Sequence, residues 1–357
     1  MNPLHQQVSD ALNHQRTELA AQMVAREFVR HPELEKRFGQ AGRKKCLQDA
    51  GYHLAYLAQA IAADQPALFR NYIAWAKVML AKRGVPATDL GGLLETMQGS
   101  LREALPLELS ELACTYLDAA LQALPQMPDE VPSFITDDAP FAPLARAYLQ
   151  ALLKGERHTA TTLILDAVKH GASVHDLYLH VFQSTQYEVG RLWQINQISV
   201  AQEHACTAAT QLIMSQLYPY IFGTEKTHGT FVATCVSGDM HEIGARMLSD
   251  FFELEGWSTH YLGANVPTQS IVQTLVEHRA SVLAISATIT YHVPAVEELI
   301  AAVRRHPECA GVKILVGGYP FKVAPDLWEK VGADGSANSA GEALSLAHRL
   351  TSQPLAA

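Results

Sequence analysis

The strongest constraint on the fold is a change in hydrophobic pattern after Thr230. From there, short β-rich runs alternate with helical stretches of about ten to fifteen residues, which predicts parallel strands joined by crossover helices. The runs read FVATCV, STHYLGA, VLAISAT and KILVGG. A short last strand is expected near Ala333–Asn338, and a closing helix over Gly341–Leu350. Residues 228–352 are therefore predicted to form a doubly wound open sheet.

The rest of the chain has helical periodicity. Residues 1–124 carry apolar stripes at three- and four-residue spacings and predict an all-helical domain, either globin-like or a bundle. Residues 125–143 hold five prolines and four acidic residues, a composition that predicts a solvated linker. Residues 144–222 predict a four-helix bundle with short turns. Within this bundle Ser199 and Gln202 form a predicted capping box, so a helix is expected to begin at Ser199.

Composition excludes several classes of protein. The chain is 48% apolar and 18% charged, as expected for a globular protein, and its net charge is −9. Without a Lys/Arg-rich run, direct nucleic-acid binding is not expected. The polar first residues do not resemble a signal peptide, and the sequence has no run of about eighteen apolar residues that could span a membrane. Five scattered cysteines without a Cys-x-x-Cys pair fit a cytoplasmic protein.

Polar and small residues gather where the predicted strands end. In an open α/β sheet, ligands bind at the carboxyl ends of the strands. The residues expected at that edge are Asp239, His241, Gly244, Gly263, Ser286, Gly317 and Gly318. The phosphate-binding glycine motifs and the Gly-x-Ser-x-Gly motif of hydrolases do not follow the first strand. The candidate site is thus a histidine loop, a serine and glycine-lined gaps.

Three of these elements in order carry a family resemblance. Asp239-x-His241-x-x-Gly244, Ser286-x-Thr288 and Gly317-Gly318 resemble the cobalamin-binding domain of methionine synthase, corrinoid proteins and mutases. Thr288 stands where the family has leucine. The resemblance implies a flavodoxin-like fold, with His241 displacing dimethylbenzimidazole as the lower ligand of cobalt. It also implies that Asp239 bonds the other ring nitrogen of His241, and that the nucleotide tail passes Ser286 and the two glycines.

The bundle before the sheet carries a second resemblance. Trp193, followed nine residues later by Glu203-His204, is similar to the cobalamin-dependent photoreceptors of the CarH, LitR and AerR type. This resemblance implies that the three side chains surround the upper axial group of adenosylcobalamin. Gln194 departs from the pattern, because CarH-type receptors have a histidine there that ligates cobalt after illumination. In this chain His204 or His180 would have to serve instead.

The domain order resembles a third group, the photocobilins, which pair cobalamin with a bilin. The aromatic and Met residues of the N-terminal helices are typical of a core; they are Tyr52, Tyr72, Trp75 and Met79. By the resemblance, the same region would bind biliverdin or another bilin, with His53 or Arg83 contacting a pyrrole or a propionate. No DNA-binding or enzymatic output domain is recognised.

Two functions remain open at this point. The first is a light sensor, not an enzyme, in which light breaks the cobalt–carbon bond of adenosylcobalamin and the helical cap rearranges. Its signal would pass through homo-oligomerisation or a regulatory protein partner. The alternative is a corrinoid methyl-carrier subunit of a methyltransferase system. Trp193 and Glu203-His204 favour the sensor, because a methyl carrier has no use for an adenosyl pocket.

Overall fold

The structure is a computed structural model that describes residues 3–352, with the backbone alone at positions 33, 34, 37 and 38. Its internal contacts divide the chain into two compact units. The first unit runs to Asp129 and also contains Thr288–Glu297 and Gly318–Gly332. The second contains Glu130–Ala287, Glu298–Gly317 and the chain from Ala333 onward. Each unit is described by itself below.

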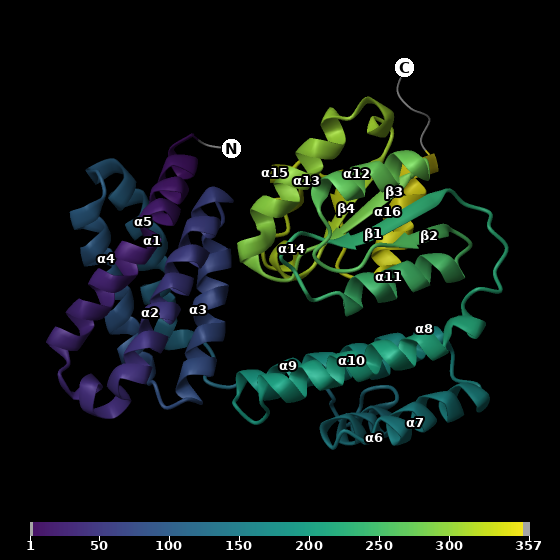
Figure 1. The fold of residues 1–357 in the computed structure, drawn as a ribbon, viewed down its shortest axis with the longest axis horizontal. Helices are drawn as coiled ribbons and strands as arrows, with labels where there is room; N and C mark the ends of the chain where they lie inside the picture. Colours follow the sequence, from purple (N-terminus) through teal and green to yellow (C-terminus); the bar gives the residue numbers. More distant parts are fainter. Residues whose placement is uncertain (1–2, 353–357) are drawn as a thin grey trace. The chain divides into compact units, whose positions relative to one another are not determined.

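The first unit, apart from its two later segments in the connections of the sheet, is built on five α-helices (Figure 1). They are α1 (Pro3–Arg30), α2 (Glu33–Ala62), α3 (Pro66–Ala81), α4 (Ala87–Ala104) and α5 (Leu107–Ala123), followed by the 3₁₀ turn η1 (Leu124–Gln126). In α1 the fully buried Val8, Leu12, Leu19 and Met23 recur at four- and seven-residue spacings, which explains why this polar sequence forms a helix with one apolar face. Gly39, with φ 59°, interrupts α2.

The predicted aromatic core of this unit is only partly buried. Tyr72 is 8% exposed, as expected of a core residue, and Met79 is half-buried. Tyr52 and Trp75 are instead 52% and 37% exposed. Their helices turn these two rings outward, so the helical stripe in the sequence overstates the core.

The second unit begins with a helical cap. Its elements are α6 (Ala142–Leu153), α7 (Arg157–Lys169), α8 (Val174–Asp176), η2 (Leu177–Gln183), α9 (Ser184–Gln194), α10 (Val200–Gln216) and η3 (Tyr218–Tyr220). The capping box at Ser199 and Gln202 is confirmed, with both reciprocal hydrogen bonds present. The sequence predicts one unbroken helix before it, but η2 is a π-helix and separates α8 from α9. An apolar stripe cannot distinguish these two helix types over seven residues.

The sheet follows the cap and confirms the predicted fold class. Its strands are β1 (Thr230–Cys235), β2 (Ser258–Tyr261), β3 (Val282–Ser286), β4 (Lys313–Gly317) and β5 (Gly335–Ser336). All pairs are parallel, in the order β2-β1-β3-β4-β5. The connecting elements are α11 (Ile243–Leu254), α12 (Thr268–Glu277), η4 (Thr290–His292), α13 (Val293–Arg305), η5 (Pro307–Cys309), α14 (Tyr319–Val323), α15 (Leu327–Lys330) and α16 (Ala340–Ser352).

An apolar core joins β1 and its neighbours to α11 and α16. Phe231 of β1 stacks on Phe252 of α11, with ring centroids 3.6 Å apart, and Trp257 packs edge-on against Phe252. Leu346 and Ala347 of α16 belong to the same buried cluster. β1 lies between β2 and β3, so the loop that leaves its carboxyl end has a strand on each side.

A polar seam ties the cap to α11 within the second unit. The hydroxyl of Tyr178 in η2 donates to the buried carboxyl of Asp250 over 2.7 Å. The guanidinium of Arg246 donates to three groups of the cap, which are the Gln211 carbonyl at 3.1 Å, the Ser215 hydroxyl at 2.8 Å and the Tyr218 hydroxyl at 2.8 Å. These bonds satisfy polar groups that packing against the cap would otherwise leave buried and unpaired.

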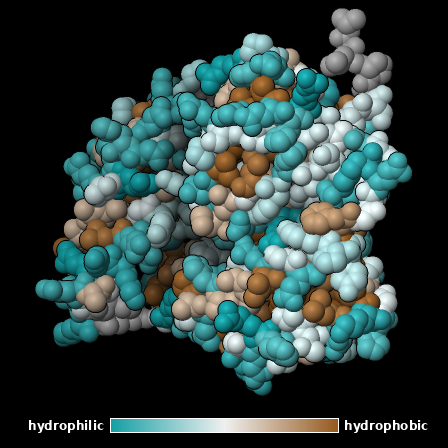
Figure 2. Space-filling view, turned by 45° about the vertical axis from the view of Figure 1, so that its right-hand side comes forward, coloured by the Kyte–Doolittle hydropathy of each residue, from teal (hydrophilic) through white to brown (hydrophobic). Residues whose placement is uncertain are grey.

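None of the helices within 3–352 is long and apolar enough to cross a membrane. On the face in Figure 2, hydrophilic side chains surround several separate hydrophobic patches.

Candidate cobalamin site

The loop after β1 places a buried carboxylate against a histidine. Gly238 opens the loop with φ 84°, and its N–H donates to the Asn265 side chain over 2.8 Å. Asp239 is fully buried. Its Oδ1 accepts from the backbone N–H of His241 at 3.0 Å and lies 2.8 Å from Nδ1 of the same residue. The imidazole is thereby fixed through Nδ1, which leaves Nε2 as the nitrogen that can ligate a metal.

Charge around His241 favours a basic imidazole. The hydrogen bond to Asp239 raises the pKa of His241 above its ordinary value of 6.5, and burial opposes this rise. The negative charges of Asp239 and of Glu203, in the first turn of α10, raise the pKa further. The structure thus brings the predicted cap residue Glu203 within electrostatic reach of the predicted ligand. A carboxylate behind a ligating histidine also raises its basicity toward a metal.

Sequence reasoning missed Glu242, the residue beside the histidine. Its carboxylate accepts from the Gln211 amide of α10 at 2.5 Å and from the Tyr261 hydroxyl of β2 at 2.9 Å. Glu242 therefore links the histidine loop to the cap and to the edge strand. Only its position next to His241 could have drawn attention to it, because Gln211 and Tyr261 are distant in sequence.

Small residues line the neighbouring strand ends. The register pairs Ser286, the last residue of β3, with Cys235 on one side and with Gly317 on the other. A Cβ atom at Gly317 would approach the Ala337 carbonyl to 3.2 Å, and one at Gly263, where φ is 84°, would lie 3.4 Å from the Glu242 carboxylate. Gly244 has open space around its α-carbon. Thr288 lies two residues after β3 and Gly318 directly after β4, and both belong to the first unit.

A hollow of about 580 Å³ lies at the carboxyl end of β5, between that strand and α16. Ser336, Ser339 and Glu342 contribute to its wall. The Ser336 hydroxyl is buried and has no hydrogen-bond partner within the described part of the chain. These features fit a cobalamin whose nucleotide tail enters this edge of the sheet. They are the unpaired Ser336 hydroxyl, the glycines that keep the strand ends open, and His241 held through Nδ1.

The residues predicted to cover the upper face of the cofactor lie where α9 ends and where α10 begins. Trp193 is half-buried near the end of α9, and Gln194 beside it is 6% exposed. Glu203 and His204 lie in the first two turns of α10, with Nδ1 of His204 hydrogen-bonded to the Glu203 carboxylate. The His204 side chain is 75% exposed. His180, the other proposed cobalt donor, stacks against Phe141 within the cap, with ring centroids 6.3 Å apart.

The first unit contains a separate buried histidine. His53 of α2 is 2% exposed, and its Nδ1 lies 2.9 Å from the Tyr72 hydroxyl of α3. Its Nε2 has no hydrogen-bond partner among the residues described. Burial lowers the pKa of His53 to about 4, so the ring is neutral at pH 7. Tyr72 stacks on Tyr56, with centroids 3.7 Å apart. Arg83 is exposed just beyond α3, and its Nη1 donates to the Met79 carbonyl over 3.0 Å.

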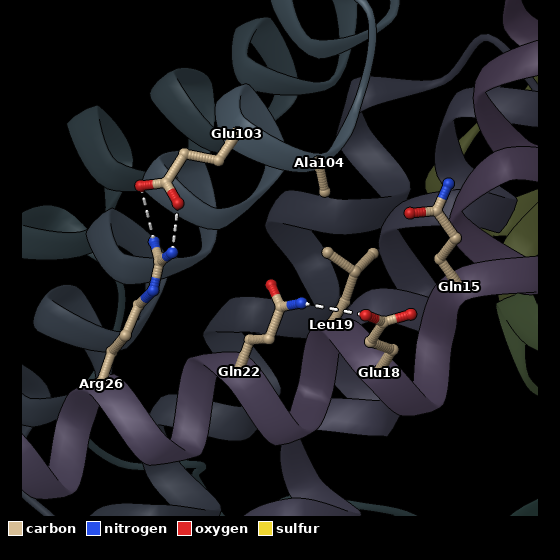
Figure 3. Close-up of a pocket in the computed structure, with 7 residues that line it drawn as sticks. All are labelled: Gln15, Glu18, Leu19, Gln22, Arg26, Glu103 and Ala104. Carbon is tan, nitrogen blue, oxygen red and sulfur yellow. Dashed lines mark hydrogen bonds and ion pairs between the residues drawn. The ribbon is translucent and has the colours of Figure 1, made fainter.

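Another hollow on the first unit carries no comparable chemistry. Figure 3 shows this depression of about 420 Å³ between α1 and the end of α4. Its charged groups satisfy one another, since the Arg26 guanidinium pairs with the Glu103 carboxylate and the Gln22 amide donates to Glu18. The candidate site therefore remains the loop at His241.

Three protein families match three separate stretches of the chain. Residues 229–345 match the B12 binding domain family, and residues 144–218 match a second family that is also described as a B12 binding domain. Residues 5–124 match the phycobilisome protein family. The sheet and the cap are thus similar to two B12 binding domains in succession.

Individual relatives extend the comparison. The chain is 30% identical over 165 residues to dimethylamine corrinoid protein 3 of Methanosarcina acetivorans, covering 46% of this chain and 74% of that protein. It is 31% identical over 166 residues to dimethylamine corrinoid protein 1 of Methanosarcina mazei, covering 46% and 73%. The solved monomethylamine corrinoid protein of Methanosarcina barkeri has the same fold over 59% of this chain and all of its own, with a TM-score of 0.53 and 22% identity.

These findings correct the first functional expectation. The relatives are named as dimethylamine corrinoid proteins, and this overturns the prediction of a cobalamin-dependent light sensor. The shared sequence and the two matched B12 binding domains show that the chain belongs to the corrinoid proteins.

Proposed function

We propose that this chain is a corrinoid methyl carrier, which accepts a methyl group from a methylated amine through one methyltransferase and yields it to a second protein. The pairing of His241 with the buried Asp239 carries the proposal, because it provides one fixed, basic nitrogen for cobalt. Cobalamin, when bound, supplies a cobalt centre that takes up and gives up a methyl group. The names of the relatives support methylated amines as the source.

The residues of this chain have distinct parts in the proposal. His241 would hold the lower face of the cofactor through Nε2, and Asp239 would keep the proton on Nδ1. Ser286, Gly317 and Ser336 would accommodate the nucleotide tail at the strand ends. Trp193 and the Glu203–His204 pair would cover the upper face and exclude water. A methyl group takes the place of the adenosyl group that the photoreceptor resemblance implied.

The test uses the chain loaded with hydroxocobalamin and reduced with titanium(III) citrate. Dimethylamine is added together with the methyltransferase that serves the Methanosarcina acetivorans relative, and cofactor methylation is followed by absorption and by mass spectrometry. We expect methylation that depends on dimethylamine. Asp239→Asn keeps the shape of the carboxylate and loses its charge, so it should bind cobalamin about 10- to 100-fold more weakly. Asp166→Asn, at an exposed aspartate of α7, is the matched control.

Two outcomes would contradict this assignment. If the relative is methylated in parallel and this chain is not, methylated amines are not its source. If the chain, loaded with methylcobalamin in the dark, does not yield the methyl group to 2-mercaptoethanol even when the second methyltransferase is present, the carrier role itself is wrong.

We propose in addition that the first unit binds a bilin beside His53. The match of residues 5–124 to the phycobilisome protein family supports this second ligand. His53 offers a buried Nε2 without a partner among the described residues, and the stacked rings of Tyr56 and Tyr72 lie beside it. The exposed guanidinium of Arg83 suits a propionate.

Biliverdin titration tests the second proposal. We expect a red-absorbing band when biliverdin is added to the full chain, and about tenfold weaker binding by His53→Gln, because a buried hydrogen bond to a polar ligand is worth about 1–2 kcal/mol. His14→Ala, at an exposed histidine of α1, serves as the control. Binding that is equal in the wild type and His53→Gln would place the bilin elsewhere, and no band at all would remove it.

A further inference from the structure

The segment Met127–Ile135, which we call the strap, joins the two units and is fixed on the side of the first unit by Lys77. This lysine of α3 is 5% exposed. Its ammonium group donates to the Met127 carbonyl over 2.6 Å and pairs with the Asp129 carboxylate at 2.8 Å. A lysine is rarely so buried unless its charge is paired. Lys77 thus anchors the first end of the strap.

The other end of the strap is fixed on helix α9 of the cap. The buried carboxylate of Glu188 accepts from the Ser133 hydroxyl at 3.1 Å and from the Phe134 N–H at 2.9 Å. Arg191 pairs with Glu188 at 2.6 Å and also donates to the Val131 carbonyl at 3.3 Å. The sequence predicts a solvated linker here, but two charged side chains of α9 hold it by its backbone. Charge-assisted hydrogen bonds of this kind are stronger than neutral ones.

The two anchors lie almost next to each other along the chain. Between Asp129, bound to Lys77, and Val131, bound to Arg191, the sequence has the single residue Glu130. The Cα atoms of Asp129 and Val131 cannot lie more than about 7 Å apart. Pro128 and Pro132 flank this step and restrict its backbone further. This first passage of the chain between the units, one of several, is therefore short and stiff.

We infer that the strap transmits changes in the first unit to helix α9 and so to Trp193, which lies two residues beyond Arg191. A change that moves α3 displaces Met127 and Asp129, and the strap has no slack to absorb the displacement before it reaches Glu188 and Arg191. The placement of Trp193 over the cofactor rests on the proposed function, whereas the mechanical coupling of α3 to α9 does not. Lys77, Glu188 and Arg191 are positioning residues in this device.

Hydrogen exchange of the full, hydroxocobalamin-loaded chain tests the coupling. Lys77→Met releases the first anchor without stranding a buried charge, because the Asp129 side chain is 84% exposed. We expect exchange in Ser184–Gln194 to become about threefold faster, because loss of one anchor lowers the cost of local opening at the other. Lys77→Arg should restore protection, and Lys44→Met, at an exposed lysine of α2, should leave it unchanged.

A Gly-Ser-Gly-Ser insertion after Glu130 separates transmission through the strap from other routes. It keeps both anchors and adds more than about 10 Å of reach. Lys77→Met should then have no further effect on α9, as in a double-mutant cycle whose coupling has been removed. The same insertion between Ala310 and Gly311 is the control and should leave the effect of Lys77→Met intact. The inference fails if Lys77→Met does not alter hydrogen exchange in α9. It also fails if Lys77→Met alters this exchange equally in the chain with the insertion after Glu130 and in the chain without it. Hydrogen exchange does not report methyl transfer, so these failures leave the carrier proposal untouched.

Discussion

Replacement of His241 by alanine is expected to lower the affinity of the chain for cobalamin by at least about 100-fold, because loss of the ligand should cost no less than loss of a supporting carboxylate. Absorption titration with hydroxocobalamin measures the affinity and also reports whether imidazole nitrogen ligates cobalt. Free imidazole added to His241→Ala should restore the histidine-ligated spectrum, because the gap left by the side chain can admit it.

The matched control for this experiment is His158→Ala, at an exposed histidine in the first turn of α7. It should bind cobalamin as the wild type does, and circular dichroism should show both variants folded. Unchanged affinity of folded His241→Ala would show that cobalt has another lower ligand.

Asp250 is expected to make the free energy of unfolding depend on pH by about 3 kcal/mol. Burial raises the pKa of this carboxyl from 3.8 to about 6, against the lowering effects of the Tyr178 hydrogen bond and the Arg246 charge, while Glu253 adds to the rise. The folded chain therefore holds a proton that the unfolded chain releases between these two values. Stability should be highest below about pH 4 for this group and should fall as the pH rises through 6.

Urea unfolding at pH 5 and pH 8 measures the upper part of this dependence, about 1.4 kcal/mol, because pH 5 lies about one unit below the folded-state pKa. Asp250→Asn removes the ionisable group and keeps an oxygen for the Tyr178 hydroxyl, so it should raise the free energy of unfolding at pH 8 by about 2–3 kcal/mol and flatten the pH profile. Asp166→Asn, on the cap surface, should change neither. If Asp250→Asn destabilises the chain at pH 8, the ionised carboxylate is a stabilising partner of Arg246 and the expected sign is wrong.

The sequence was sufficient where the relevant chemistry is local. Ser199 caps a helix three residues before Gln202, so their spacing alone predicts the capping bonds. Asp239 and His241 are two residues apart in the loop that follows a strand, and the resemblance of this short motif to the cobalamin-binding domain implies their bond. Tyr178 and Asp250 are 72 residues apart, and the sequence pattern does not connect them. The contacts of the linker cannot be predicted from the sequence, because they come from Glu188, whose position in a helical pattern indicates only an ordinary helix charge. The predicted light sensor is wrong because Trp193 and Glu203-His204, which resemble an adenosyl pocket, do not by themselves identify the group that binds there.

The π-helix η2 gives the cap one place where a change of chain length is absorbed locally. A π-helical turn holds its hydrogen bonds from residue i to i+5, so it accommodates an additional residue that an α-helix would not. Deletion of one residue from Leu177–Gln183 would return this stretch to regular α-helix and leave Glu188, Arg191 and Trp193 close to their present faces. The same deletion within α9 would instead rotate the residues after it by about 100° about the helix axis. Single-residue changes of length should therefore be tolerated in η2 and excluded from α9.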